Sequence, residues 1–170
     1  MNILLELETH PMDIREVRKY LPHHSKAVLY KTLSNSKEYL FKNHTCVIVL
    51  YESRKLKQGH YVVLINRGNH VAYFSSLGLP PRDELTKLKL GESPKFQKVL
   101  KSNYTYNKTA LQNISDYKIN TCGWFCIARC LLHKLPIAEF VKLFKTRNAS
   151  PDEIIARMSL LLKYSVRLVL

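Results

Sequence analysis

Long apolar runs are missing from the chain. The longest ones, such as residues 46–51 and 61–65, fall far short of the roughly 20 residues that a membrane-spanning helix needs. The first 20 residues also lack the cationic stretch, apolar core and small-residue cleavage site of a signal peptide. These absences argue against a membrane protein and against a secreted one. Four cysteines in a chain of this kind are therefore expected to be reduced thiols rather than a disulfide framework.

Acidic residues are scarce relative to basic ones. Asp and Glu number 13 against 27 Lys and Arg, which gives a formal charge of +14. Such an excess attracts polyanions, nucleic acid above all, through contacts that release counterions and weaken with salt. We therefore expect nonspecific DNA binding, while a basic protein without a nucleic-acid role stays an alternative. The basic residues are spread along the chain: Arg54, Lys55, Lys57, Lys87, Lys89, Lys95, Lys98, Lys101, Lys142, Lys145 and Arg147.

Internal repeats and low-complexity segments are also missing. A hydrophobic content of 46% with 24% charged residues is that of an ordinary globular protein. At 170 residues the chain is long enough for one core and short for two. The sequence therefore predicts a single domain over residues 1–170.

The first half of the chain alternates between helical and strand patterns. Residues 11–21 carry apolar positions at helical spacing and end at Pro22. Residues 45–53 are typical of a strand, and residues 59–76 of a hairpin that turns at Arg67-Gly68-Asn69. Two prolines at 80 and 81 then end the sheet pattern.

The second half is mainly helical. Residues 83–101 predict two short helices with basic exposed faces, broken at Gly91 and Pro94. A short strand and a long polar loop follow, leading into a buried helix that starts at CGWFC. Pro136 opens another helix, and a capping box at Ser150 opens the last one. The order predicts an α+β fold.

Three cysteines share the buried helix at spacings of four. Cys122, Cys126 and Cys130 would form a stripe about 12 Å long, too extended to converge on one zinc ion. Cys126 and Cys130 are therefore expected to be core residues, as is Cys46 in its strand. Cys122 differs, because it follows two residues that can cap a helix, Asn120 and Thr121. A thiol in the first turn of a helix faces free N–H groups, which favour the thiolate and can receive an oxyanion.

A nucleophilic cysteine needs a base, and histidine is the usual one. Of the seven histidines, His60 stands at the start of a strong strand, where a side chain can look into a cleft. Because Gly123, directly after Cys122, has no side chain, it would also let a substrate backbone approach closely.

In combination, GHYVVLIN, VAYFSSLG, a glutamine-bearing loop and TCGWFC resemble the cysteine proteases of the adenovirus maturation protease and Ulp1/SUMO-protease group. The likeness is greater to the versions carried by virophages, polintons and large DNA viruses, and it spans about residues 45–131. It implies a papain-like α+β fold, a mixed central sheet flanked by helices with the nucleophile at a helix N-terminus. It also implies Cys122 as nucleophile and His60 as general base, without a metal or organic cofactor.

Two positions depart from the family pattern. Ser75 stands where the family has a carboxylate beside the histidine; Asn69 in the hairpin turn is the other candidate for this third position. The oxyanion glutamine would be Gln112, ten residues before Cys122, whereas the usual spacing falls on Ser115 and Asp116. Gln112 is preferred, because a carboxylate would repel a developing oxyanion.

The resemblance implies a monomeric endopeptidase that processes capsid or other structural precursors during virion maturation, within a virion or a host cell. Two alternatives stay open. One is an isopeptidase acting on ubiquitin-like or SUMO-like conjugates. The other is a non-catalytic, basic DNA-binding virion protein that keeps the fold.

Overall fold

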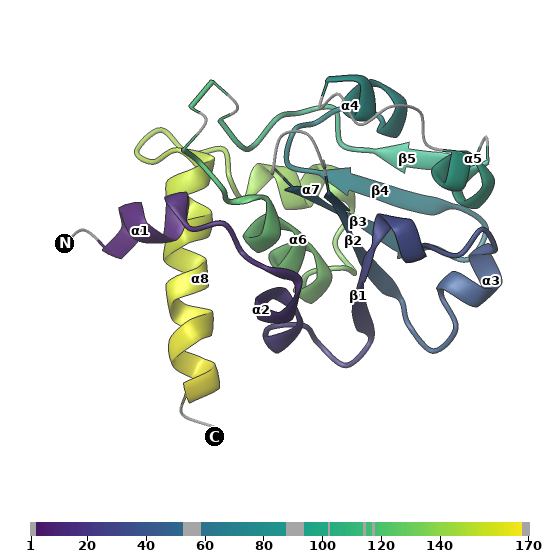
Figure 1. The fold of residues 1–170 in the computed structure, drawn as a ribbon. Helices are drawn as coiled ribbons and strands as arrows, with labels where there is room; N and C mark the ends of the chain where they lie inside the picture. Colours follow the sequence, from purple (N-terminus) through teal and green to yellow (C-terminus); the bar gives the residue numbers. More distant parts are fainter. Residues whose placement is uncertain are drawn as a thin grey trace.

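A computed structural model describes residues 3–52, 59–87, 94–101, 103–113, 115–116 and 118–167. At its centre lies a five-stranded sheet in the order β1-β2-β3-β4-β5, with helices on both faces (Figure 1). The two outer pairs, β1–β2 and β4–β5, are parallel, and the two inner pairs are antiparallel. The strands are β1 (Ser25–Leu29), β2 (Cys46–Glu52), β3 (Gly59–Asn66), β4 (Val71–Ser75) and β5 (Tyr104–Tyr106). The predicted α+β fold, a mixed sheet flanked by helices, is confirmed.

Helices before, between and after the strands complete the domain. No helix among the described residues is long and apolar enough to span a bilayer. The helices are α1 (Ile3–Thr9), α2 (Ile14–Lys19), the 3-10 turn η1 (Tyr30–Thr32), α3 (Lys37–Leu40), α4 (Pro81–Lys87), α5 (Pro94–Leu100), α6 (Cys122–Leu131), α7 (Ile137–Lys142) and α8 (Pro151–Arg167).

The side chains of β3 alternate between two cores, as the pleat of a strand requires. Tyr61, Val63 and Ile65 belong to the core that includes α6. Val62 and Leu64 belong to the opposite core, beneath α4 and α5. The same alternation places His60 on the α4 side of the sheet, at the end of the strand.

The hairpin and the buried helix were predicted correctly. β3 and β4 pair from Val62 with Ser75 to Asn66 with Val71, and Gly68 in the turn has a φ of 76°. In α6, Cys126 and Cys130 are fully buried, as predicted. Cys46 on β2 is also fully buried.

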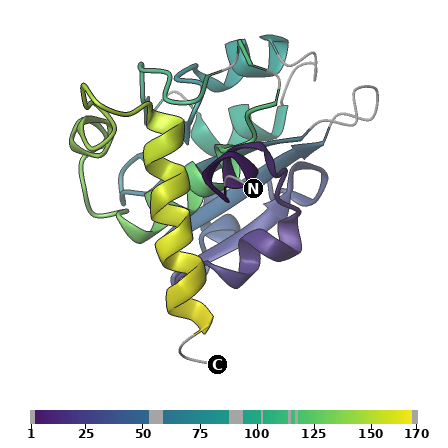
Figure 2. The same ribbon diagram turned by 90° about the vertical axis from the view of Figure 1, so that its left-hand side faces the viewer.

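Besides η1 and α3, the structure adds two further elements that the sequence patterns did not indicate, α1 and β1. β1 is an edge strand with only two buried residues, so its pattern is weak. α1 buries a single residue, Leu7, and lies across α8 (Figures 1 and 2). Both depend on tertiary contacts for their stability rather than on a strong local signal.

The end of α8 that faces α6 is capped as predicted. The Ser150 hydroxyl oxygen accepts a hydrogen bond from the Glu153 N–H at 3.1 Å. The Glu153 carboxylate pairs with Arg157 one turn later, so only half of the capping box forms. The break predicted at Gly91 and the basic residues Arg54, Lys55, Lys57 and Lys89 lie outside the described residues.

Candidate active site

Cys122 is the first residue of α6, and its side chain is almost buried, with 8% of the residue exposed. Thr121, one of the two residues expected to cap this helix, is its N-cap residue, but its side chain does not form a capping hydrogen bond. The Thr121 hydroxyl donates to Asp152 at 2.5 Å, and the Asn120 amide donates to the carbonyl oxygens of Thr9 and Lys118. The first turn is therefore left without a side-chain cap, and the N–H of Gly123 is directed at the Cys122 sulfur instead.

His60 is the second residue of β3 and is 5% exposed. The structure brings it to Cys122, with a hydrogen bond between the two side chains. Nε2 of His60 lies 2.6 Å from Oε1 of Glu84 and 3.1 Å from Oγ of Ser75. Nδ1 is thus left for the contact with Cys122.

Glu84 is the functional residue that sequence reasoning missed. It belongs to α4, which was expected to begin two residues later and to present an exposed basic face. Glu84 is instead fully buried under β4, beside Leu85. Besides His60, its carboxylate accepts hydrogen bonds from the hydroxyls of Ser75 and Tyr73. A buried carboxylate with three donors is fully satisfied and keeps one orientation.

Ser75 lies beside His60, as the sequence indicated, but it connects the histidine to Glu84 and does not take the place of a carboxylate. Its hydroxyl donates to Glu84 at 2.5 Å and contacts His60, so the charge comes from α4 and not from the strand. Asn107 holds the backbone of Ser75 from both sides, at 3.0 Å to its N–H and 2.6 Å to its carbonyl oxygen.

Asn69, the alternative to Ser75, lies in the exposed turn at the far end of the hairpin. Its side-chain oxygen contacts the ring of His70 at 2.8 Å. Six residues of extended β3 separate the turn from His60, a distance of about 20 Å. The suggestion that Asn69 occupies the third position is therefore wrong. The signal that could have pointed to Glu84 is the uncharged Ser75 itself, since it leaves the imidazole in need of a carboxylate from elsewhere.

The charges of this site favour a thiolate–imidazolium pair. Burial alone would lower the pKa of His60, but the carboxylate of Glu84 and the sulfur of Cys122 outweigh it and raise that pKa to about 10. Burial also disfavours the Cys122 thiolate. The hydrogen bond and charge of His60, and the N–H groups of Tyr61 and Gly123, outweigh this and lower the pKa of Cys122.

Gln112 lies in the loop that leads to Cys122. Its Oε1 accepts from the Ser76 hydroxyl at 2.8 Å, and its Nε2 donates to the carbonyl oxygen of Ile119 at 3.0 Å. These two hydrogen bonds hold the amide of Gln112 between Ser76, which follows Ser75, and Ile119, which lies three residues before Cys122. One of the two hydrogens on Nε2 satisfies Ile119, which leaves the other for a further acceptor.

Asp116, the competing candidate, is exposed and holds a local turn through the N–H of Lys118 at 2.9 Å. Its carboxylate is engaged outside the site. The structure therefore favours Gln112 on position, and its role as oxyanion donor stays a prediction.

The space beside Gly123 is filled by the N-terminal segment rather than left open for a substrate. A Cβ at this position would lie 3.0 Å from the sulfur of Met12 and 3.4 Å from the Tyr61 ring. The Tyr61 hydroxyl also donates to the carbonyl oxygen of Met12 at 3.1 Å. Glycine at 123 is explained by this packing.

Comparison with known proteins gives a viral relative and several solved structures of low sequence identity. No protein-family model matches the chain. Uncharacterized protein V9 of Sputnik virophage is 26% identical over 163 residues, covering 85% of this chain and 91% of that protein.

Three solved structures resemble the chain at low sequence identity. ChlaDub1 from Chlamydia trachomatis is 14% identical, with a TM-score of 0.46, over 97% of this chain and 76% of the other. Cdu1 of the same organism, solved bound to ubiquitin, is 15% identical with a TM-score of 0.46, over 97% and 78%. The Ulp1 protease domain, solved with the yeast ortholog of SUMO, is 11% identical with a TM-score of 0.38, over 96% and 76%. The specific likeness to the adenovirus maturation protease stays a prediction.

Proposed function

We propose that the protein is a cysteine peptidase with Cys122 as nucleophile, His60 as general acid and base, and Glu84 as the acidic third member. One observation carries the proposal: a single buried imidazole lies between the Cys122 thiol and a buried carboxylate. Cys122 and His60 were expected in these roles, and Glu84 takes the place expected of Ser75. Ser75 acts as a positioning residue that holds Glu84 and His60 together.

In the first half of the reaction, the Cys122 thiolate attacks the carbonyl carbon of the scissile amide. The carbonyl oxygen becomes an oxyanion, which Gln112 Nε2 and backbone N–H groups at the start of α6 stabilise. The protonated His60 then donates its proton to the leaving nitrogen, the C–N bond breaks, and a thioester to Cys122 remains.

In the second half, a water molecule attacks the thioester. Neutral His60 takes a proton from this water, and the C–S bond breaks to release the carboxylic acid product. The proton on His60 and the thiolate of Cys122 restore the starting ion pair. Glu84 stabilises the imidazolium at both ends of this cycle and keeps its Nε2 occupied, so the ring presents Nδ1 to the sulfur.

The substrate that we propose is a structural precursor protein of a virus or virus-like element, cleaved near small residues during particle maturation. The virophage relative supports this setting. An isopeptidase acting on ubiquitin-like or SUMO-like conjugates is the alternative within the same chemistry, because such tails also end in glycine. Incubation with capsid precursor and with ubiquitin-like adducts separates the two: cleavage of the adducts alone would overturn the maturation role.

Active-site labelling tests the chemistry itself. A peptide ending in glycine and carrying a thiol-directed electrophile should label one cysteine, with labelling lost in Cys122→Ala and at least about 100-fold slower in His60→Ala. Cys126→Ala, one turn further along α6, is the matched control and should label like the parent protein. Equal labelling of all four cysteines would show that no thiol is activated and would favour a non-catalytic protein.

A second function, nonspecific DNA binding, is favoured by the charge of +14. Exposed lysines and arginines lie on helices far apart in the chain, for example Lys98 and Lys101 at α5 and Lys142 on α7. We propose that they hold the protein on a packaged genome. Binding to a duplex should fall steeply and linearly on a logarithmic scale as salt rises. Failure to bind a duplex even at low salt would remove this function and leave the peptidase untouched.

A further inference from the structure

A second group of cysteine and histidine side chains lies at the other end of α6. One ring nitrogen each of His24 and His133 and the sulfur of Cys46 all lie within 4.8 Å of one another. The two ring centroids are 4.2 Å apart, and the ring planes are tilted by 46° to each other. Three segments distant in sequence converge here: the loop before β1, the start of β2 and the end of α6.

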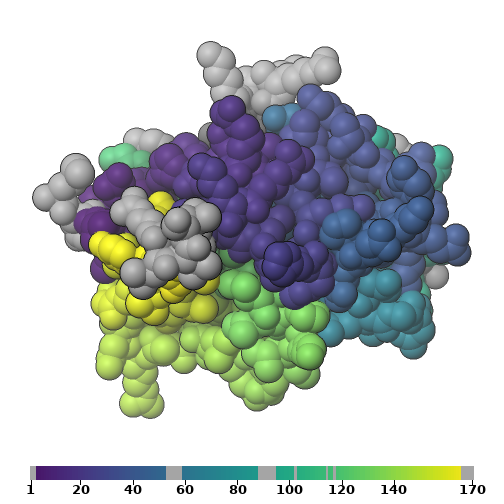
Figure 3. Space-filling model, turned by 90° about the horizontal axis from the view of Figure 1, so that it is seen from below, coloured from purple at the N-terminus to yellow at the C-terminus, as the bar shows by residue number. Residues whose placement is uncertain are grey.

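The fold gives a reason for this convergence. β1 and β2 are parallel with Ser25 opposite Cys46, so His24 and Cys46 lie at the same end of the sheet. The N–H groups of Thr45 and Cys46 donate to the carbonyl oxygen of His24 and fix this register. His133 follows α6 by two residues and meets them there. On the face seen in Figure 3, the purple surface of the first part of the chain borders the green surface of the segment after α6.

We infer that His24, Cys46, His133 and Cys130 form a binding site for zinc. Thiolate sulfur and neutral imidazole nitrogen are the ligands that zinc prefers in structural sites, four at a time. Cys130 is the fourth ligand that we assign: its thiol interacts with that of Cys46, although its sulfur lies outside the group of three whose ligand atoms are all within 4.8 Å of one another and would have to move closer. This site is independent of the proposed peptidase chemistry.

The two imidazoles are oriented as metal ligands usually are. Nε2 of His24 and Nδ1 of His133 both lie within hydrogen-bonding distance of the carbonyl oxygen of Cys130, at 3.2 and 3.1 Å. In the neutral tautomer that donates this N–H to the carbonyl, the other nitrogen of each ring keeps a lone pair for the ion. Both rings are half-buried, so an ion can reach the site from solvent while the sulfurs lie behind them.

The spacing requires only a modest contraction. Zinc bonds of about 2.0 to 2.3 Å in a tetrahedron place ligand atoms roughly 3.3 to 3.8 Å apart. Half-buried side chains can close the remaining distance by rotation about χ1 and χ2. The end of α6 also carries the negative pole of the helix dipole, which favours a cation.

The positive charge around the proposed zinc site favours two thiolate ligands over one. Arg129 and Arg67 are the cations near Cys46, and among the described residues no Asp or Glu pairs with Arg129. Two more positive charges there would be unfavourable. Zinc with two thiolates and two neutral imidazoles has no net charge, whereas zinc with one thiolate would add a positive charge. The guanidinium groups therefore favour a site with both sulfurs ionised.

Zinc titration of the full chain tests the site. The titration uses Cys122→Ser protein, because Cys122 and His60 could also bind the ion, and it monitors competition with a chromophoric zinc indicator. We expect one zinc per chain and a rise in the unfolding midpoint of about 5 to 10 °C at 100 times the dissociation constant. Cobalt in place of zinc should give thiolate-to-cobalt charge-transfer absorption, which carboxylate or imidazole sites lack.

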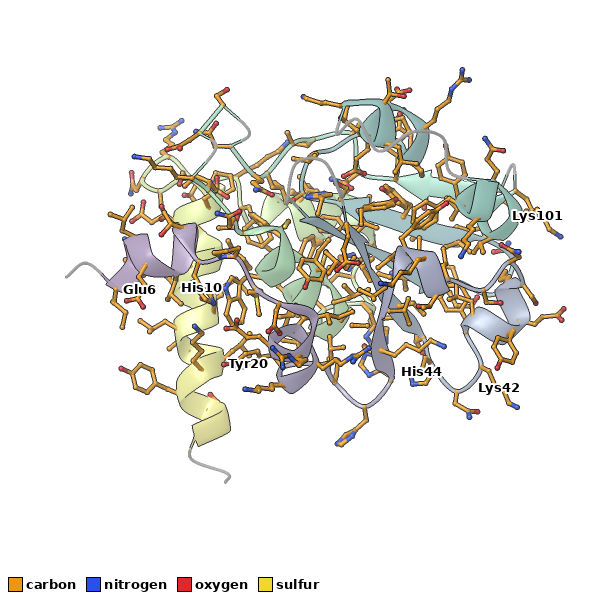
Figure 4. All side chains as sticks on the ribbon, in the orientation of Figure 1. Glu6, His10, Tyr20, Lys42, His44 and Lys101 are labelled. Atoms are coloured by element: carbon orange, nitrogen blue, oxygen red, sulfur yellow. The ribbon has the colours of Figure 1, made fainter. Side chains whose placement is uncertain are left out.

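Variants locate the ligands. In the same background, His133→Gln, His24→Gln and Cys46→Ser should each weaken zinc binding by at least about 100-fold, and Cys130→Ser by about 10- to 100-fold. His44→Gln is the matched control, since His44 lies two residues before Cys46 but its ring contacts the carbonyl oxygen of Lys42 (Figure 4). Its affinity should equal that of the parent.

Two results would overturn the inference. One is unchanged zinc affinity in both histidine variants, which are half-buried and expected to fold even if the Cys46 variant does not. The other is a cobalt spectrum without thiolate charge transfer. Unchanged affinity in Cys130→Ser alone would overturn the four-ligand assignment.

Discussion

The two ends of α6 carry the same residue types in different surroundings. At the first end, Cys122 meets His60, which is buried and paired with Glu84. At the other end, Cys46 and Cys130 lie near two half-buried histidines and the guanidinium groups of Arg67 and Arg129, and no carboxylate of the described residues pairs with them. Burial and the neighbouring His24 lower the pKa of His133, whereas Glu84 and Cys122 raise that of His60 despite its burial. The carboxylate of Glu84, together with the sulfur of Cys122, thus favours a protonated imidazole at the first end, whereas burial and His24 favour a neutral His133 at the second.

Replacing Glu84 should make the electrostatics at the first end of α6 resemble those at the second end. Glu84→Gln keeps the shape of the side chain but removes its charge, so the pKa of His60 should fall and the ion pair should weaken. We expect a peptide-electrophile labelling rate about 100- to 10,000-fold lower, measured across pH. Asp83→Asn, the exposed neighbour on α4, should label at the parent rate. A labelling rate in Glu84→Gln within threefold of the parent would show that the carboxylate is structural only.

The proposed oxyanion donor, Gln112, lies in the loop that leads to the first end of α6. Gln112→Ala removes Nε2 and should lower kcat about 10- to 1,000-fold with little change in KM, because the interaction forms only with the developing oxyanion. Asp116→Asn should leave both constants unchanged. If instead the glutamine variant changes KM alone, Gln112 binds the substrate and is not part of the oxyanion site.

Stability against pH separates the contribution of His60 from that of Cys122. In Cys122→Ala protein the sulfur no longer contributes, and we expect the charge and hydrogen bond of Glu84 to outweigh burial and keep the pKa of His60 above its unfolded value of about 6.5. The folded state then binds more protons, so this contribution is complete below about pH 6.5 and is lost as pH rises through the folded pKa. Denaturant unfolding of Cys122→Ala should therefore show stability falling over this range, and Cys122→Ala/Glu84→Gln should show a shallower fall. Parallel curves would mean that Glu84 does not hold the proton on His60.

The smallest effect is expected from the hydroxyl that supports Glu84. Tyr73→Phe removes one of the three donors to the buried carboxylate and should lower the free energy of unfolding by about 1 to 3 kcal/mol. Tyr51→Phe is the control, because its hydroxyl contacts Tyr73 at 3.4 Å and does not reach Glu84. It should cost less than Tyr73→Phe in the same denaturant titration.

Local sequence patterns were sufficient to predict the elements that hold His60 and Cys122 at the first end of α6. The hairpin has a clear turn and alternating apolar residues, and the position of Cys122 before an apolar helical run was readable. These are signals of neighbouring residues, which a sequence displays directly. The pairing of Cys122 with His60 came from the resemblance, since no local signal joins residues so far apart.

The remaining features depend on contacts between distant segments. In PRDELTK, Glu84 looks like an exposed acid in the first turn of a short helix, and only the packing of α4 under β4 buries it. Thr121 looks like a cap, yet Asp152 from α8 takes its hydroxyl. The cluster at the second end needs the parallel pairing of β1, a strand whose own pattern is too weak to predict.

The path of the N-terminal segment limits how a polypeptide can approach Cys122. The carbonyl oxygens of Glu8 and Thr9 accept hydrogen bonds from Asn120, and that of Met12 accepts one from the Tyr61 hydroxyl. This segment is therefore held in place along one side of Cys122. An extended substrate of the proposed peptidase cannot occupy that flank of Cys122 while residues 8–12 lie there. Removing residues 1–12 should thus open this flank of Cys122, although these residues lie more than 100 residues before it in sequence.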